Sequence, residues 1–174
     1  SSVTQIALKQ APSSWAIIEP QLSAINTLQV FLCSQEGTII YCTEKDYLDL
    51  GLKGGPYSHI SISPSGKLVA LYTAQGQIQI LTSDFASELT RFTTRAHGPP
   101  EQLSWCGGDA VMAVWCTELE YVALLVAADG TYGFIKYEDV VVTITECDGV
   151  RILSSGGCEF ISRISSTVQF IYCF

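Results

Sequence analysis

The amino-acid sequence predicts an all-β chain, and three observations predict it. Short apolar or alternating stretches rich in Val, Ile, Tyr and Trp follow one another closely. Gly or Pro bounds many of these stretches, as expected between neighbouring strands. No window of 12 or more residues sustains an amphipathic helical pattern with helix caps.

The strands can be placed from these patterns in chain order. Residues 59–63 and 77–80 alternate polar and apolar side chains, which favours half-buried strands. Other stretches are rich in Val, Ile, Tyr and Trp, which favours further strands. We expect strands at residues 28–33, 38–42, 58–63, 67–73, 77–81, about 88–94, 101–105, 110–116, 122–127 and 140–145.

Four glycines group these strands into units. Gly37, Gly76, Gly130 and Gly149 each follow an acidic or amide residue and precede an apolar stretch, where positive φ would permit a tight hairpin. Gly37 and Gly76 are 39 residues apart, which is about one four-stranded propeller blade. The next intervals are 54 and 19 residues, so one hairpin could be an insertion or an outer-strand pair.

Residues 1–174 are therefore predicted to form a single β-propeller region of the WD-repeat-like type, with about four blades. This is either a complete small propeller or about half of a larger one. The turn at residues 63–67 contains Gly-Lys but lacks the phosphate-loop spacing, so we interpret it as a hairpin turn. Pro99 and Pro100 predict a rigid connector between blades.

Composition limits the classes of partner. Apolar residues make up 48% of the chain and charged residues 15%, which argues against disorder. The net charge of −8 and the scattered cations disfavour nucleic acid and anionic lipid. The longest apolar runs, at 110–116 and 121–128, are too short to span a bilayer. We found no leader pattern, and the sequence favours a cytosolic piece of a longer protein.

The cysteines indicate no disulfide framework and no metal site. There are seven, an odd number at irregular positions, so reduced thiols are expected. The separations of Cys33 from Cys42 and of Cys106 from Cys116 fit adjacent antiparallel strands carrying buried thiols. The acidic pairs Glu118/Glu120 and Glu138/Asp139 fall in predicted loops and are interpreted as solvated surface charge.

A catalytic constellation has little support in the sequence. The histidines are His59, on a predicted strand, and His97, in a loop ahead of Cys106. A Cys106–His97 nucleophile pair is conceivable from the spacing but has no local motif behind it. Trp105 and Trp115 are predicted to fill the space between blades, a ligand platform being the alternative. No catalytic, cofactor-binding or metal-binding residue is assigned, and no cofactor is expected.

Three stretches in the second half of the chain resemble a known family. They are Arg95–Cys106, with Pro-Pro ahead of an apolar-x-Trp-Cys strand, Ala110–Trp115, and Glu146–Ser154, with Asp-Gly-Val-Arg-Ile and Glu159-Phe160-Ile161 shortly after. These features resemble the N-terminal propeller region of the vacuolar protein sorting-associated protein 16 family. The agreement covers residues 91–174. Residues 1–90 match only in the blade-like spacing of their strands, and residues 117–145 depart most from the family pattern.

The resemblance implies the later blades of a seven-bladed propeller, normally followed by a helical solenoid. It implies a non-enzymatic subunit of the HOPS and CORVET membrane-tethering complexes in endosome-to-lysosome or vacuole transport. The partners would be other subunits, with no nucleic acid, no small-molecule substrate and no membrane insertion. The location would be cytoplasmic, peripheral on late endosomes and lysosomes or vacuoles. The family's SNARE-regulating partner binds the solenoid, so no functional residue is transferred.

Two other functions remain open from the residues. An unrelated WD-repeat-type adaptor is the alternative, although the Gly-His and Trp-Asp dipeptides of such repeats are missing. A propeller enzyme would need polar side chains that converge in one channel.

Overall fold

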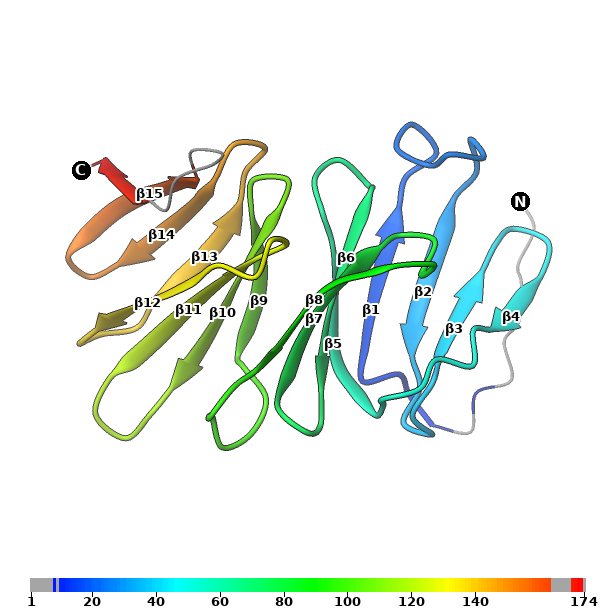
Figure 1. The fold of residues 1–174 in the computed structure, drawn as a ribbon, viewed down its shortest axis with the longest axis horizontal. Coiled ribbons are helices and arrows are strands. Elements are labelled where there is room, and N and C mark those ends of the chain that lie inside the picture. The colour runs from blue at the N-terminus through cyan, green and yellow to red at the C-terminus, as the bar shows by residue number, and fades with distance from the viewer. Residues whose placement is uncertain (1–7, 9, 164–169, 174) are drawn as a thin grey trace.

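The computed structural model describes residues 8, 10–163 and 170–173. In this part of the chain the regular secondary structure consists of β-strands (Figure 1). They form four antiparallel sheets of four strands each. We call the sheets blades 1 to 4 in chain order. They are β1 (Ser14–Ile18), β2 (Gln29–Cys33), β3 (Ile39–Cys42) and β4 (Tyr47–Asp49); β5 (Tyr57–Ile62), β6 (Leu68–Thr73), β7 (Gln77–Thr82) and β8 (Glu88–Thr93); β9 (Gln102–Cys106), β10 (Ala110–Cys116), β11 (Tyr121–Ala127) and β12 (Tyr132–Tyr137); and β13 (Val142–Thr145), β14 (Val150–Ser154), β15 (Gly157–Arg163) and β16 (Phe170–Cys173).

Within each blade every strand pairs with its neighbours in the chain, so each blade is a simple meander. Figure 1 shows the four blades side by side in chain order, from the blue first blade to the orange and red fourth. Side chains on facing sheets pack together between blades, which is how a propeller buries its apolar surface. The predicted all-β propeller is confirmed.

The predicted strands lie within one or two residues of the observed ones. In blade 2 the predicted order of inner strand, turn, two central strands and outer strand is confirmed by β5–β8. Strands β12 and β14 were expected only as the apolar stretches after Gly130 and Gly149, and four strands, β1, β4, β15 and β16, were not predicted. β1 is only five residues long, and β4 has three exposed residues, so neither carries a long apolar signal.

The uneven glycine spacing has a simple cause. Gly37 and Gly76 close the second hairpin of blades 1 and 2, whereas Gly130 closes the third hairpin of blade 3 and Gly149 the first of blade 4. No insertion is needed, because each of these hairpins belongs to a regular blade. The first hairpins of blades 2, 3 and 4 contain Gly66, Gly107 and Gly149, at intervals of 41 and 42 residues.

The expectation of positive φ holds for Gly37, Gly76 and Gly130 and is wrong for Gly149. At Gly149 the requirement is close approach. A Cβ there would lie 2.3 Å from the carbonyl oxygen of Ile161 and 2.6 Å from the ring of Phe160. Glycine is used because no side chain fits against the neighbouring strand.

The two tryptophans pack between blades 2 and 3, as predicted. Trp105 is completely buried with Ala70, Ile80 and Val111. Trp115 is largely buried against Tyr72, with ring centroids 5.9 Å apart, and its indole N–H donates to the carbonyl oxygen of Gly98 at 3.2 Å. Gly98 belongs to the connector that contains Pro99 and Pro100, so this connector joins blades 2 and 3.

Candidate interaction surfaces

The structure separates the two residues of the candidate nucleophile pair. Cys106 ends β9 and is fully buried in the core between blades 3 and 4, where its thiol donates to the carbonyl oxygen of Ile161 at 3.4 Å. His97 is exposed in the connector and lines a hollow with Tyr72 and Gly76 of blade 2. The two side chains therefore lie on different sides of blade 3, and the arrangement is not that of a nucleophile with its base.

His59 lies on β5 and is half-buried between blades 2 and 3. Its Nδ1 is 3.0 Å from the Ser58 hydroxyl, and its ring contacts Tyr72 edge-on at 6.5 Å. Burial lowers the pKa of His59 below its ordinary value, since the charged ring is poorly solvated there. The neutral imidazole is thus a packing element of the blade interface.

The cysteines divide into buried and exposed groups. Cys33, Cys42 and Cys106 are buried, and desolvation raises the pKa of Cys33 to about 12. The expectation of a buried thiol is wrong for Cys116, because β10 ends there and the chain turns outward. Cys147 and Cys158 are also exposed, and the side chain of Cys173 lies outside the described residues. Among the described residues no group of three or more His, Cys, Asp or Glu could hold a metal ion.

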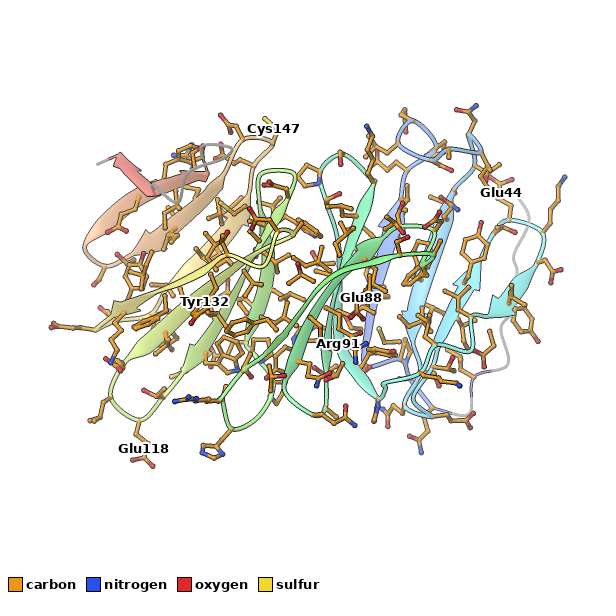
Figure 2. The ribbon with its side chains drawn as sticks, in the orientation of Figure 1. Glu44, Glu88, Arg91, Glu118, Tyr132 and Cys147 are labelled. Carbon is orange, nitrogen blue, oxygen red and sulfur yellow. The ribbon has the colours of Figure 1, made fainter. Side chains whose placement is uncertain are left out.

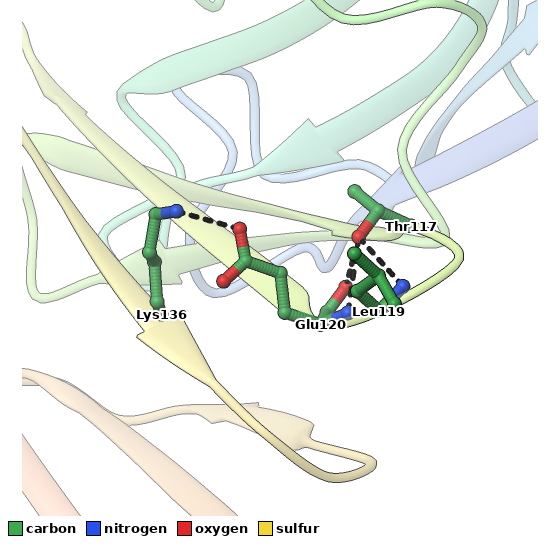
Figure 3. Close-up of polar contacts among 4 residues, drawn as sticks. All are labelled: Thr117, Leu119, Glu120 and Lys136. Atoms are coloured by element: carbon green, nitrogen blue, oxygen red, sulfur yellow. Dashed lines mark hydrogen bonds and ion pairs between the residues drawn. The ribbon is translucent and has the colours of Figure 1, made fainter.

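The acidic pairs lie in loops, as predicted. Glu138 and Asp139 are exposed between β12 and β13, and Glu118 is at the tip of the β10–β11 loop (Figure 2). Glu120 forms an ion pair with Lys136 across blade 3 at 2.6 Å (Figure 3). In the same loop the Thr117 hydroxyl donates to the Glu120 carbonyl at 2.7 Å and accepts from its N–H at 3.1 Å. These bonds hold the loop in one shape.

One side of blade 1 is an apolar face with exposed side chains. Ala16 and Ile18 point toward blade 2, so Trp15 and Ile17 point the other way, and they are 61% and 41% exposed. Register places Leu32 opposite Trp15 and Val30 opposite Ile17, which continues the apolar surface across the sheet. This face has the side-chain composition of the interfaces between blades.

Blade 4 also has a side with exposed apolar side chains, but of a different kind. Val142, Ile144 and Leu153 are each partly to half exposed there. Register places Arg151 beside Ile144, and its guanidinium lies 5.5 Å from the ring centroid of Phe160. The face is therefore apolar with a charged centre, suited to a partner surface that is part polar.

A groove lies between the outer parts of blades 2 and 3 and has a volume of about 640 Å³. On their central strands the two blades touch through Tyr72, Ile78, Ala113 and Val126. The groove lies beside this contact and is lined by residues of the outer strands β8 and β12. We call this space the inter-blade groove. Its apolar lining is Phe92, Trp115, Val122, Leu124, Tyr132 and Phe134.

The remainder of the groove lining is threonine, alanine and a single charged residue, Arg95. Phe92 and Tyr132 contact each other with ring centroids 4.8 Å apart. Figure 2 shows Tyr132 on the yellow outer strand of blade 3. Sequence reasoning missed this site, because β12 was expected only as the continuation of a hairpin and the facing residues of β8 are distant in the chain.

In the part of the chain that the structure describes, no helix is both long enough and apolar enough to cross a lipid bilayer.

Solved structures with this arrangement of strands are β-propellers of very different sequence. The WD40 domain of Toxoplasma gondii coronin matches with a TM-score of 0.54 and 11% identity over 84% of this chain and 42% of its own. The BBS1N chain from a complex with ARL6 matches with a TM-score of 0.57 and 9% identity over 92% of this chain and 50% of its own. A putative 6-phosphogluconolactonase from Bacteroides uniformis also matches, with a TM-score of 0.53 and 13% identity over 90% of this chain and 52% of its own. Such likeness shows the fold alone.

Sequence comparison with curated proteins is more informative. A vacuolar protein sorting-associated protein 16 homolog from Dictyostelium discoideum is 30% identical over 94% of this chain and 20% of its own length. A probable homolog from Schizosaccharomyces pombe is 36% identical over 66% of this chain and 14% of its own. Protein VACUOLELESS1 of Arabidopsis thaliana is 31% identical over 71% of this chain and 14% of its own length. The chain thus spans about a fifth or less of the length of these relatives.

The family model described as "Vps16, N-terminal region" matches residues 3–173. The similarity therefore extends well beyond residues 91–174, to which the sequence motifs had confined it, and it includes blades 1 and 2. The sequence motifs, the four-bladed fold and this match agree, and the chain belongs to the Vps16 N-terminal region family.

Proposed function

We propose that the chain is a protein-interaction scaffold in vacuolar protein sorting, as part of a subunit of the HOPS and CORVET membrane-tethering complexes. The observation that carries this proposal is the family match over residues 3–173. The surfaces support it, because the blades present large apolar side chains outward, as protein-interaction surfaces do. The protein is non-enzymatic in this proposal, and its partners are other subunits of the complexes.

The same proposal includes the location and the complete domain. The protein acts on the cytoplasmic side of late endosomes and lysosomes or vacuoles, held there by protein partners. Residues 1–174 form four blades of a seven-bladed propeller, and the apolar face of blade 1 packs against a further blade. Two features support this closure: the chain covers 42–50% of the coronin and BBS1N chains, and Trp15 and Ile17 repeat the composition of a covered blade face.

Affinity purification of the full-length protein with mass spectrometry tests the proposal. We expect HOPS and CORVET subunits to co-purify in comparable amounts, and an untagged strain serves as the control. Recovery of an unrelated multiprotein complex, with no tethering subunit, would contradict it. A second arm uses His97→Ala and Cys106→Ser variants, for which we expect normal complex assembly and normal vacuolar sorting. Loss of sorting with assembly intact would indicate an enzyme instead.

A further inference from the structure

We propose that the inter-blade groove is the docking site for a segment of a partner protein that carries large apolar side chains next to an acidic residue. This inference rests on the proposed scaffold function and assigns that function to one surface. Three observations support it: exposed aromatic side chains, a single cation in the groove lining, and a fixed groove shape.

The aromatic side chains on one face of β12 are largely exposed. Tyr132 and Phe134 are 58% and 66% exposed, whereas Ile135 and Tyr137, on the opposite face, pack against the core between blades 3 and 4. Blade 2 covers this face only in part, through the contact of Phe92 on β8 with the Tyr132 ring. Exposed aromatic residues next to a largely buried tryptophan, here Trp115, are typical of protein interfaces.

The charge of the groove selects the chemistry of the occupant. Arg95 is the one charged residue that lines it, and no described residue forms an ion pair with the Arg95 guanidinium. By contrast, Arg91, Lys136 and Arg151 are paired with glutamates. An unpaired guanidinium beside apolar walls, in a chain of net charge −8, is suited to bind a carboxylate.

The groove is already shaped before any partner binds. The Phe92–Tyr132 contact joins its two sides at a ring distance of 4.8 Å. At one end, Thr117 and the Glu120–Lys136 ion pair fix the loop that borders it (Figure 3). A preformed groove lowers the entropy cost of binding, which favours a short segment.

A lipid surface fits the same groove less well. Leu119, in the neighbouring loop, is 90% exposed and could enter a bilayer, but Glu118 and Glu120 flank it. These carboxylates are repelled by anionic headgroups at the depth that Leu119 would have to reach. A protein segment is therefore the occupant that the charges favour.

Site-specific photo-crosslinking in the full-length protein tests the proposal. A benzoyl-phenylalanine residue replaces Phe134 in cells, and crosslinked peptides are identified by mass spectrometry. Leu89 on β8 is the matched control, since it is an exposed apolar residue outside the groove lining. We expect a defined partner peptide with an Asp or Glu beside large apolar residues at position 134 and not at position 89. The Arg95→Glu variant should lower the yield of this crosslinked peptide about five- to tenfold. A partner in which Lys replaces the acidic residue should restore the yield with this variant.

Each other outcome overturns the inference. Crosslinks to lipid alone, no protein crosslink at position 134, or a crosslinked peptide whose yield is unchanged by Arg95→Glu would each do so. Because Arg95 is exposed, its substitution should leave the stability of the fold unchanged, and an unchanged thermal unfolding midpoint of the variant checks this. If tethering subunits still co-purify in these cases, the groove assignment fails while the scaffold function stands. If they never co-purify, the scaffold function itself fails.

Discussion

The interface between blades 2 and 3 and the exposed apolar face of blade 1 are built from the same kind of strand, yet their side chains have opposite environments. At the interface, Trp105 is fully buried between two sheets. On the blade 1 face, Trp15 is mostly exposed, although it too lies in a row of apolar cross-strand neighbours. The alternation of a strand therefore sets which side chains share a face, and the neighbouring sheet decides whether that face is buried.

The largest expected difference is between the two tryptophans. Trp105→Ala should lower the free energy of unfolding by about 3–5 kcal/mol, because it leaves a cavity between two sheets. Trp15→Ala should change the free energy of unfolding by less than about 1 kcal/mol in the 174-residue chain, because the Trp15 side chain is already mostly exposed. Urea unfolding followed by circular dichroism measures both.

The same pair of variants in the full-length protein sharpens the comparison. If a further blade covers blade 1, as proposed, Trp15→Ala should there cost nearly as much as Trp105→Ala. Equal small costs for Trp15→Ala in both lengths of chain would show that no blade packs on this face. A small cost for Trp105→Ala in the short chain would contradict the interface itself.

The seam between blades 1 and 2 should show an intermediate effect. A Cβ at Gly55 would lie 1.9 Å from the carbonyl oxygen of Gly37, so Gly55→Ala forces the two backbones apart. We expect a loss of about 1–3 kcal/mol, as for other overpacked sites. Differential scanning fluorimetry gives a first measure of the loss, and urea unfolding gives its size.

Gly108→Ala is the matched control for this variant, because no atom lies within 4 Å of its added Cβ and its φ is not positive. It should be neutral to within about 0.5 kcal/mol. Equal effects of the two substitutions would show that the blades are not in close contact at Gly55.

The sequence predicted the fold better than it predicted the surfaces. Strands such as β6 and β10 are apolar on both faces, so composition alone reveals them, and Gly76 marks the turn after β6. The position of Gly149 in its blade could not be predicted, since its requirement is a contact with β15 that only the folded sheet creates. Assigning each glycine to a particular hairpin needs the strand pairing itself.

The inter-blade groove was missed for a related reason. It combines Phe92 and Tyr132, which are 40 residues apart and belong to different sheets. Local patterns in the sequence report which residues share a strand face, and they do not report which faces of two different sheets meet. Likewise, nothing in the chain near Arg95 indicates that this cation lacks a carboxylate partner among the described residues.

The smallest expected effect concerns pH at the interface of blades 2 and 3. Burial lowers the pKa of His59 below its ordinary 6.5, so the unfolded chain binds a proton at a higher pH than the folded chain does. The contribution of His59 to stability is therefore complete above about pH 6.5–7 and is lost as the pH falls through 6.5 toward the lower, folded value. His59→Gln keeps a polar side chain without the titration, and the difference in unfolding free energy between the two proteins should shrink or change sign by a few tenths of a kcal/mol or more between about pH 7.5 and 5.5. Because the carboxylates are common to both chains, their titration cancels in this difference. A difference that stays constant over the range, or a His59 proton resonance that titrates at or above 6.5 by NMR, would show that the ring is open to solvent and that the two blades do not close over it.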